Sequence, residues 1–466
     1  MSIESEPQPD DEIYSIGLKI TAGSLPPLHS LSSKQVSYLA IRISGQLLAE
    51  YHFDLTTFSR KVEVRTNFYG ITIVGRTASA AIAKSVSRKY WRRRLQYESD
   101  IARLNFEASQ KKVGGSSSNA QIYASDITLQ KTRSKKFDTQ RFLEKKVIVN
   151  TTTGKKTLLS ELASQAAVNR FNELYWIAKN FEAIANHQSM GWLFVTYTAP
   201  PEYHPNPLKG KCSYDSKLGV KGSHSYISSA WARIRSLLNK WRIKAGMNSY
   251  FGIRTAETHK DGSIHWHLLV FVADEVSQPF IDASKEHFPN HSQLKIEAGD
   301  RSRGSASSYI FKYLAKGFDP SISNTDDGSA ADGDDLREQD DLASIRNGER
   351  VRAALQTMRV RQYQTFGVKN VLTLVRAVNK LQDDEFCEFQ GEVAEFVKEK
   401  VWRNPLGLKN LLEQPNLITK RNGTAPLMLI RKEVTNAYGE KTFKVTGLKV
   451  GINIIHTEGK FKIEDV

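Results

Sequence analysis

The chain has 466 residues and a net charge of +16, with 40% hydrophobic and 25% charged residues. This length predicts more than one domain and at least one sizeable core, and the lack of an 18-residue apolar run excludes a transmembrane helix. The acidic start MSIESEPQPDDE is not a secretory signal, and the two cysteines, Cys212 and Cys387, lie far apart without CxxC pairing. They exclude a disulfide scaffold and a cysteine zinc site, so we expect a cytoplasmic protein with no membrane partner.

The predicted elements are mainly helices with a few strands between them. Residues 1–30 are polar and dotted with proline, which indicates a loose leader, and GGSSSN at 114–119 is a flexible break. The spacing of apolar residues predicts helices over 33–53, 79–107, 158–187, 225–245, 305–316, 347–362, 369–382 and 391–402. The sequence also predicts a strand at 191–198, a hairpin over 250–273 and strands in the tail at 424–458 with a turn at 436–440.

The charge is unevenly distributed along the chain. Residues 321–345 hold eight acidic side chains against Arg337 alone, a net −7, so the remainder carries +23. A surplus of that size attracts polyanions such as nucleic acid, although many basic proteins bind none. The acidic segment has the composition of a disordered linker or mobile loop.

The helix predicted over 79–107 contains the string SRKYWRRRLQY, in which cations stand beside Tyr90, Trp91 and Tyr97. Its candidate DNA-binding cations are Arg88, Lys89, Arg92, Arg93 and Arg94. Cations interleaved with aromatic rings are typical of single-strand binding surfaces, but a solvated amphipathic helix explains the same pattern. The basic run at 131–146 is open to the same two interpretations.

The most informative segment is FGIRTAETHKDGSIHWHLLVFVADE, residues 251–275. Its string KDG at 260–262 suits a three-residue hairpin loop with the glycine in the left-handed conformation. Because side chains alternate along a strand, this register places Glu257 opposite His265, with His267 on the same face. Two imidazoles and one carboxylate then converge and leave positions open for water and substrate oxygens, as in a catalytic metal site.

Other interpretations of this segment stay open. A two-residue turn would shift Glu257 out of line, and many strands carry a bare His-x-His without any metal. His259 is either a turn residue or a weak fourth ligand candidate. Trp266 is expected on the opposite face of the strand.

A second constellation lies in SASSYIFKYLAKGFDP, residues 305–320. Tyr309 and Tyr313 are four residues apart and share one face of the predicted helix, and Lys312 and Lys316 repeat that spacing on the adjoining face. A phenol is a poor nucleophile at neutral pH, but a cation on the scissile phosphate can activate its attack. The alternative is that both tyrosines only pack the helix against the core.

Taken together, the strand carrying His265 and His267 and the later pair Tyr309 and Tyr313 resemble the HUH endonucleases. More narrowly, the chain is similar to the replication gene A proteins of tailed phages related to P2. The similar strings are WLFVTYTAPPEYHP (192–205), RTAETHKDGSIHWHLLVFV (254–272), SYIFKYLAKGFD (308–319) and RVRQYQTFGVKNV (359–371). The first departs from its relatives, which usually have Thr-Cys-Pro where this chain has TYTAPP. Weaker similarity extends the match to about residues 85–450.

The resemblance implies a site-specific single-strand endonuclease that initiates rolling-circle replication through a 5′-phosphotyrosine intermediate. His265 and His267 would hold Mg2+ or Mn2+ with Glu257 as third ligand, and one tyrosine would nick the origin while the other rejoins the displaced strand. Lys312 and Lys316 would contact phosphate or help the phenol lose its proton. The implied partner is DNA, as a single-stranded or locally melted replication origin in the cytoplasm of a host bacterium.

The same resemblance implies an α+β fold. Its HUH core would be an antiparallel sheet with the histidine strand central and helices on one face, followed by added helical segments and a small β-rich C-terminal part. The expected divisions are an N-terminal leader and basic helical region (1–120), a catalytic domain (121–320), the acidic linker (321–345), a helical region (346–412) and a β-rich end (413–466).

The chain lacks a phosphate-binding loop. The nearest string, NTTTGKKT at 150–157, lacks the first glycine and puts a second lysine before the threonine. We therefore expect no ATPase activity, and the helicase and polymerase would be separate host proteins.

Three rival functions remain. A relaxase or transposase would use the same chemistry on other DNA sites. A non-catalytic DNA-binding replication protein would use the histidines only for structure. A cupin-like metal enzyme also carries His-x-His on a strand, but it explains neither the tyrosine pair nor the basic charge.

Overall fold

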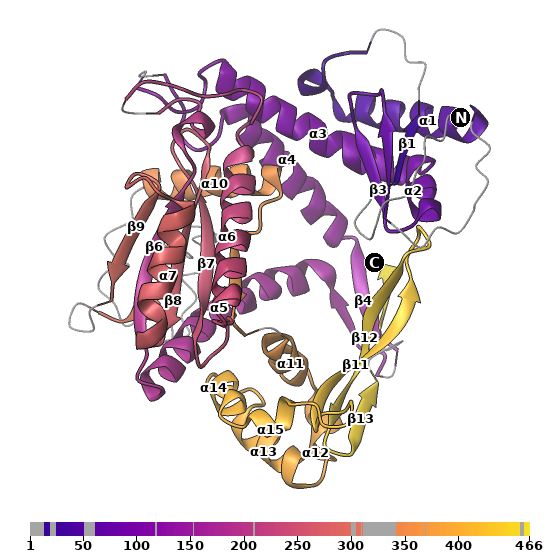
Figure 1. Ribbon diagram of the computed structural model, residues 1–466. Helices are drawn as coiled ribbons and strands as arrows, with labels where there is room; N and C mark the ends of the chain where they lie inside the picture. The colour runs from indigo at the N-terminus through magenta and orange to yellow at the C-terminus, as the bar shows by residue number, and fades with distance from the viewer. Residues whose placement is uncertain are drawn as a thin grey trace. The chain divides into compact units, whose positions relative to one another are not determined.

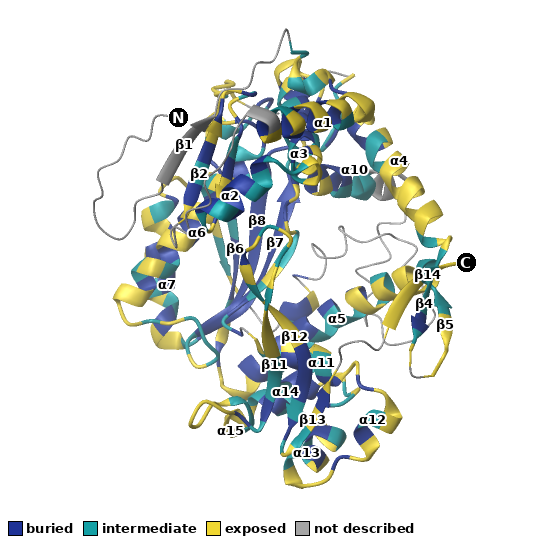
Figure 2. Cartoon of the chain, turned by 90° about the vertical axis from the view of Figure 1, so that its right-hand side faces the viewer, coloured by how far each residue is buried: buried dark blue, intermediate teal, exposed yellow. Residues whose placement is uncertain are grey.

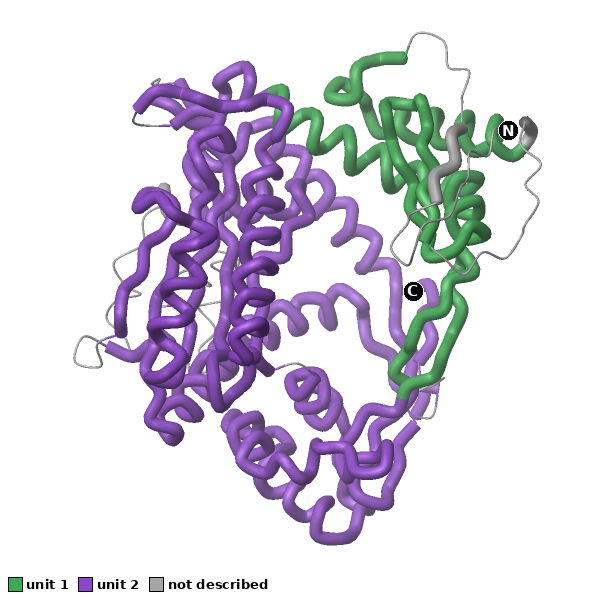
Figure 3. Tube along the Cα trace, viewed as in Figure 1, with its two compact units in different colours: residues 1–106, 431–445 green, residues 107–430, 446–466 purple. Residues whose placement is uncertain are grey.

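The structure is a computed structural model. It describes residues 14–18, 25–50, 61–116, 119–151, 153–207, 210–299, 304–308, 310, 342–368, 370–456 and 461–466, with the backbone alone at 14–18, 49–50 and 342–346. The chain forms two compact units, which are coloured separately in Figure 3. Unit 1 comprises residues 1–106 and 431–445, and unit 2 comprises residues 107–430 and 446–466. None of the described helices is both long and apolar enough to cross a membrane.

Unit 1 is built on a small sheet of three strands that the sequence interpretation did not anticipate. Its strands are β1 (Tyr14–Leu18), β2 (Val62–Thr66) and β3 (Thr72–Gly75), with β1 parallel and β3 antiparallel to β2. The unit's helices are α1 (Ser33–Glu50), α2 (Ala78–Ser85) and the larger part of α3 (Arg88–Ser109). The buried apolar residues of α1 at i, i+3 and i+4 spacing pack with those of β2 and β3, which confirms the helix predicted over 33–53.

The helix predicted over 79–107 is two helices. Thr77 caps α2 by accepting a hydrogen bond from the Ala80 N–H, and α2 ends at Ser85. The Ser87 hydroxyl then accepts a hydrogen bond of 3.3 Å from the Tyr90 N–H, which marks the start of α3. The apolar pattern continues across this break, so the sequence alone indicated one helix.

Unit 2 contains a five-stranded antiparallel sheet in the order β10-β7-β8-β6-β9. The strands are β6 (Gly191–Thr198), β7 (Tyr250–Thr258), β8 (Ile264–Val272), β9 (Leu294–Ala298) and β10 (Tyr363–Phe366). The predicted strand and hairpin are confirmed, and β8, which carries the two histidines, is central as expected. Strands β9 and β10 were not predicted from the sequence.

Helices cover both faces of this sheet, so the expectation of helices on one face is wrong. Helices α6 (Gly222–Lys240) and α7 (Asp274–His287) lie along one face, as Figure 1 shows. Helix α5 (Leu159–His187) packs on the other through a cluster that includes Phe181, Phe251 and Leu269. The reason is that β7 and β8 carry apolar residues on both faces, and every residue of both strands is buried (Figure 2).

The rest of unit 2 consists of further helices and two small sheets. Part of one sheet is formed by residues 431–445, which are assigned to unit 1. The helices are α4 (Asp126–Leu143), α10 (Leu342–Met358), α11 (Val371–Val378), α12 (Asp383–Cys387), α13 (Glu392–Lys400), α14 (Gly407–Leu412) and α15 (Pro415–Ile418). One sheet has the order β14-β4-β5, from Phe461–Asp465, Lys146–Asn150 and Lys156–Leu158. The other has the order β11-β12-β13, from Leu427–Thr435, Lys441–Val450 and Asn453–His456, and it confirms the predicted β-rich tail. The architecture is therefore α+β.

Candidate metal centre

The hairpin of β7 and β8 has the register that the sequence predicts. Glu257 pairs with His265, and Thr255 pairs with His267. The loop is closed by a hydrogen bond of 2.7 Å from the His259 N–H to the Ser263 carbonyl, and its glycine has φ +85°. The three-residue loop thus sets which side chains of the two strands meet.

Three donor groups converge on one face of this hairpin. The Nε2 atoms of His265 and His267 lie 2.8 Å apart, and Glu257 Oε2 lies 3.7 Å and 3.4 Å from them, respectively. All three side chains are buried, and one donor atom from each lies within 4.8 Å of the other two. Two imidazole nitrogens and a carboxylate oxygen in this arrangement can hold a metal ion.

Contacts around His267 fix its ring. Its Nδ1 lies 3.0 Å from Thr196 Oγ1 on β6, and Phe194 of the same strand stacks on it with centroids 5.6 Å apart. When Nδ1 carries the proton and donates to Thr196, the lone pair of Nε2 is free for a metal. His265 differs, because its Nδ1 is buried without a hydrogen-bond partner among the described residues.

His259 lies beside the three donor groups without joining them. Its ring centroid is 4.0 Å from that of His265 and 5.0 Å from that of His204. Burial, and next the charge of His265, lower the pKa of His259 well below the usual 6.5, so the ring is neutral near pH 7. Its Nε2 is buried without a hydrogen-bond partner among the described residues.

The loop end of the hairpin is held by a polar network that the sequence interpretation missed. Asp261 Oδ2 accepts from His204 Nδ1–H at 3.0 Å, and Asp261 Oδ1 accepts from the backbone N–H of Ser263 at 3.0 Å and its hydroxyl at 2.6 Å. Thr196 and His204 both lie in the string WLFVTYTAPPEYHP. Alternation along β6 could have placed Thr196 on a face, but only the pairing of β6 with β8 brings it to His267.

The sequence-predicted nucleophiles lie outside the described residues. These are Tyr309, Tyr313, Lys312 and Lys316, and most of the acidic segment 321–345 also falls there. The residues just before them are described. The Ala306 N–H and the Ser307 hydroxyl donate to the carboxylate of Glu182 at 2.8 and 2.6 Å. Ile310 is fully buried in the same cluster as Phe194, on the sheet face that carries His267.

The aromatic and cationic residues of α3 are separated by the structure. Trp91 is fully buried, and its Nε1–H donates to the Ser85 carbonyl, so this ring is a core residue of unit 1 and is not available for base stacking. Arg88, Lys89, Arg92 and Arg93 are exposed, whereas Arg94 is half-buried and pairs with Glu98 at 2.8 Å. These four cations therefore face solvent, as both interpretations of this string expect.

Similar proteins come from phages and prophages. The replication protein of Haemophilus phage HP1 is 27% identical over 66% of this chain and 39% of its own length. The replication gene A protein of Escherichia phage 186 is 30% identical over 66% of this chain and 44% of its own length. A probable replication endonuclease from a prophage-like region of Salmonella typhi is 26% identical over 60% of this chain and 34% of its own length.

The matched part thus amounts to less than half of each of these relatives, and no solved structure matches the chain. The sequence profile of the bacteriophage replication gene A protein family matches residues 71–321, which is more than half of the chain. As the sequence motifs predict, this chain belongs to that family.

Proposed function

We propose that this chain is a metal-dependent, site-specific DNA endonuclease of the HUH type that initiates rolling-circle replication. The observation that carries the proposal is the convergence of Glu257, His265 and His267 on the central strand of the sheet. Membership in the replication gene A protein family supports it, and the relative from Salmonella typhi is named a probable replication endonuclease.

Glu257, His265 and His267 would hold one divalent cation, and their donor set fits such an ion. Imidazole nitrogens suit later transition metals and carboxylates suit Mg2+ and Mn2+, so the mixed set favours Mn2+ over Mg2+, which prefers oxygen ligands. When bound, the ion would draw charge from the scissile phosphate and lower the barrier to nucleophilic attack. The Thr196 hydroxyl would keep His267 in the tautomer that presents Nε2.

Tyr309 or Tyr313 would supply the nucleophile. The phenol oxygen forms a bond to phosphorus, the bond from phosphorus to the 3′ oxygen breaks, and the leaving oxygen takes up a proton. The products are a 5′-phosphotyrosine link and a free 3′-OH that serves as a primer. The second tyrosine would repeat the exchange after one round of copying and release a closed strand, while Lys312 and Lys316 would contact phosphate or assist the loss of the phenol proton.

The described start of the tyrosine segment supports this assignment. Ala306 and Ile310 are buried with Phe194, whose ring stacks on His267. Glu182 anchors the segment through Ala306 and Ser307. The chain that leads into the tyrosine motif is therefore packed on the sheet face that bears the candidate metal ligands.

DNA would be the substrate, as a single-stranded or locally melted origin, with helicase and polymerase supplied by the host. A nicking assay tests the proposal, with a panel of single-stranded oligonucleotides drawn from the chain's own gene and flanking DNA. We expect cleavage at one position with Mn2+, none with EDTA, and a loss of at least about a hundredfold in His267→Ala. Tight DNA binding without cleavage of any oligonucleotide would favour the non-catalytic alternative.

A further inference from the structure

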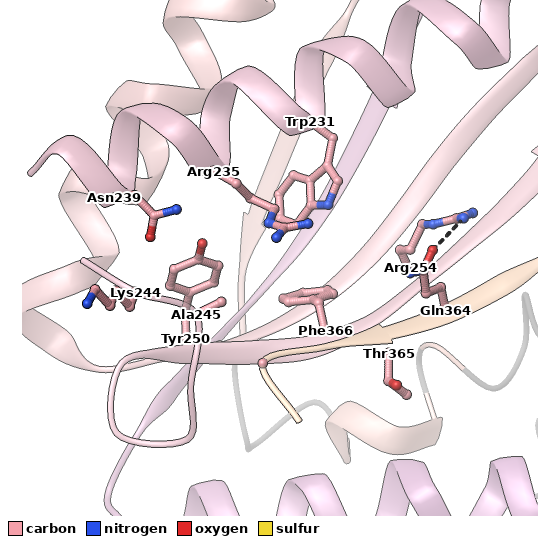
Figure 4. A pocket seen from close by; sticks show the side chains of 11 residues that line it. Trp231, Arg235, Asn239, Lys244, Ala245, Tyr250, Arg254, Gln364, Thr365 and Phe366 are labelled. Carbon is pink, nitrogen blue, oxygen red and sulfur yellow. Dashed lines mark hydrogen bonds between the residues drawn. The ribbon is translucent and has the colours of Figure 1, made fainter. Parts of the chain in front are cut away.

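The described part of unit 2 has a pocket of about 270 Å³ on the sheet face opposite the candidate metal centre. It lies between α6, β7 and the edge strand β10. Tyr250 and Arg254 point into it, and because side chains alternate along β7, they face away from Glu257. Figure 4 shows Arg235 and Asn239 reaching from α6 toward Tyr250, with Arg254 at the other end.

Three cations and no acidic side chain line this pocket. The cations are Arg235, Lys244 and Arg254, and none of them forms an ion pair with a described residue. Anionic groups bind where such charges converge, because charge-assisted hydrogen bonds are about twice as strong as neutral ones.

Arg254 is the most informative of the three cations. Only 6% of it is exposed, and its guanidinium stacks 4.1 Å from the ring centroid of Trp266. It donates to the Arg361 carbonyl and to Gln364 Oε1, both at 3.0 Å, and neither acceptor carries a full negative charge. A buried guanidinium whose charge is not neutralised is costly unless an anion binds beside it.

The surroundings of Arg254 add no compensating charge. Burial, and next the charge of Arg254, lower the pKa of His224 to about 4, so His224 is neutral and its Nδ1 accepts from the Trp266 indole N–H at 3.1 Å. Burial, and next Arg361, lower the pKa of Arg254 itself to about 10, so it still carries its charge near neutral pH.

The remaining lining suits a sugar or a base. Trp231 and Phe366 form an apolar floor with their rings 5.3 Å apart at 66°. Asn239 and Gln364 bring amide groups to the two ends of the pocket, where they can bond to base edges. The volume is just below the 300–1,000 Å³ range of small-molecule sites, so it fits one small unit and no duplex.

We propose that this pocket binds a single nucleotide, with its phosphate held at Arg235 and its base or sugar against Trp231 and Phe366, toward the charge of Arg254. The nucleotide is either one unit of a DNA strand or a free mononucleotide. The chemistry of the two is the same, and only the source differs. The inference goes beyond the proposed function, because it concerns the other face of the sheet and needs no bond cleavage.

The experiment compares two double variants with the wild-type chain by calorimetry in EDTA. Arg235→Gln with Lys244→Gln removes two pocket cations and leaves the buried Arg254 in place. Arg233→Gln with Lys240→Gln is the matched control, because both cations are exposed on α6 and neither lines the pocket. The probes are a short oligodeoxythymidylate, dTMP and inorganic phosphate.

We expect the pocket variant to lose at least about tenfold in affinity for the oligonucleotide, for dTMP, or for both, and the control to lose less than about twofold. A loss for the oligonucleotide identifies a DNA strand as the source, and a loss for dTMP alone identifies a free nucleotide. Equal losses in the two variants, no binding of either nucleotide probe, or equal affinities for phosphate and dTMP would overturn the proposal. Because EDTA prevents metal-dependent cleavage, a failed nicking assay does not affect this result.

Discussion

At the scale of single residues, the candidate metal centre depends on how its two imidazoles are oriented. His267 is fixed on one edge by Thr196 and on one face by Phe194, whereas His265 has Glu257 and His259 as its ring neighbours. A ligand ring held by a hydrogen bond at Nδ1 presents Nε2 in one direction, so the hydroxyl of Thr196 contributes to metal affinity without touching the metal.

Thr196→Val tests this positioning role. We expect the variant to bind Mn2+ about 10 to 100 times more weakly, because the Nδ1–H of His267 loses its acceptor while the shape of the side chain is kept. Titration of Mn2+, followed by the spectroscopic signal of the free ion, measures the affinity. Thr198→Val is the matched control, since it lies on the same face of β6 and its hydroxyl makes no hydrogen bond to a described residue. Equal affinities in the two variants would refute the role.

Glu440 is a buried acidic residue of unit 1 whose ionisation is coupled to the stability of that unit. Burial alone would raise its pKa, but hydrogen bonds from Lys84 (2.7 Å), Asn436 (2.9 Å) and the Arg76 N–H (3.1 Å) outweigh burial and lower the pKa to about 2. Because the pKa of Glu440 is lower in the folded state than the ordinary 4.5, its ionised form stabilises the unit. The stabilisation is complete above about pH 4.5 and is lost as the pH falls toward 2.

We therefore expect Glu440→Gln to destabilise unit 1 by up to about 3 kcal/mol at neutral pH, with the difference from wild type shrinking between about pH 5 and pH 2. Hydrogen exchange of the β2 and β3 peptides reports the free energy of opening of this unit. Glu433→Gln is the control, because its ion pair with Lys441 is largely exposed and should contribute less than about 1 kcal/mol. A difference that does not change with pH would contradict the assignment.

At the scale of elements, the hairpin loop decides whether the metal ligands meet. Shifting a strand by one residue moves all of its side chains to the opposite face. Deleting Thr258 keeps the three-residue loop but moves Glu257 opposite Ile264 and onto the other face of β7, so we expect Mn2+ binding to disappear. Lys260→Ala keeps the register and should bind Mn2+ like the wild type, since the Lys260 side chain is exposed. Mn2+ binding by the deletion variant would show that the register does not control the site.

Helix α3 provides a second test at this scale, because its exposed cations are candidate DNA contacts from the sequence while its buried tryptophan packs the core. Arg88→Gln with Arg92→Gln should weaken the binding of single-stranded DNA and lower the slope of log affinity against log salt by about 0.7 for each phosphate that the variant no longer neutralises. The thermal stability should not change, because both side chains are exposed. The control is Lys34→Gln with Arg42→Gln on the exposed side of α1. Equal effects in the two variants would identify the binding as a general effect of charge.

Elements with strong local patterns are predictable from this sequence, and those that depend on distant partners are not. Helix α1 and strand β6 are marked by their own periodicity or composition, and the hairpin is marked by its loop string. Strand β9 has five residues and β10 has four, and each exists only because a longer strand lies beside it. Helix α7 carries Pro279, which weakens its helical pattern.

The residues of the candidate site also fall into those that the sequence predicts and those that it does not. Glu257, His265 and His267 could be predicted because a local turn sets their register. The contact of Thr196 with His267 joins residues 71 positions apart and depends on which strand lies next to β8. The nucleotide pocket likewise needs α6, β7 and β10 together, so no local string could have indicated it.

At the scale of the whole molecule, charge and family membership both support the proposal that the chain acts on DNA. The residues outside 321–345 carry a net charge of +23. The chain belongs to the replication gene A protein family. A positive surplus of this size raises the rate of encounter with a polyanion but reads no sequence, so under the proposed function site specificity would come from the residues around the cleavage point.

The proposed mechanism requires that a tyrosine of the segment 308–319 becomes joined to DNA. The most direct measurement is a denaturing gel that detects a covalent protein–DNA adduct, with Mn2+ or EDTA, for the wild type, Tyr309→Phe, Tyr313→Phe and the double variant. We predict an adduct that requires Mn2+ and disappears in the double variant, and the single variants will show which tyrosine acts first. An adduct that survives in the double variant would show that neither tyrosine is the nucleophile.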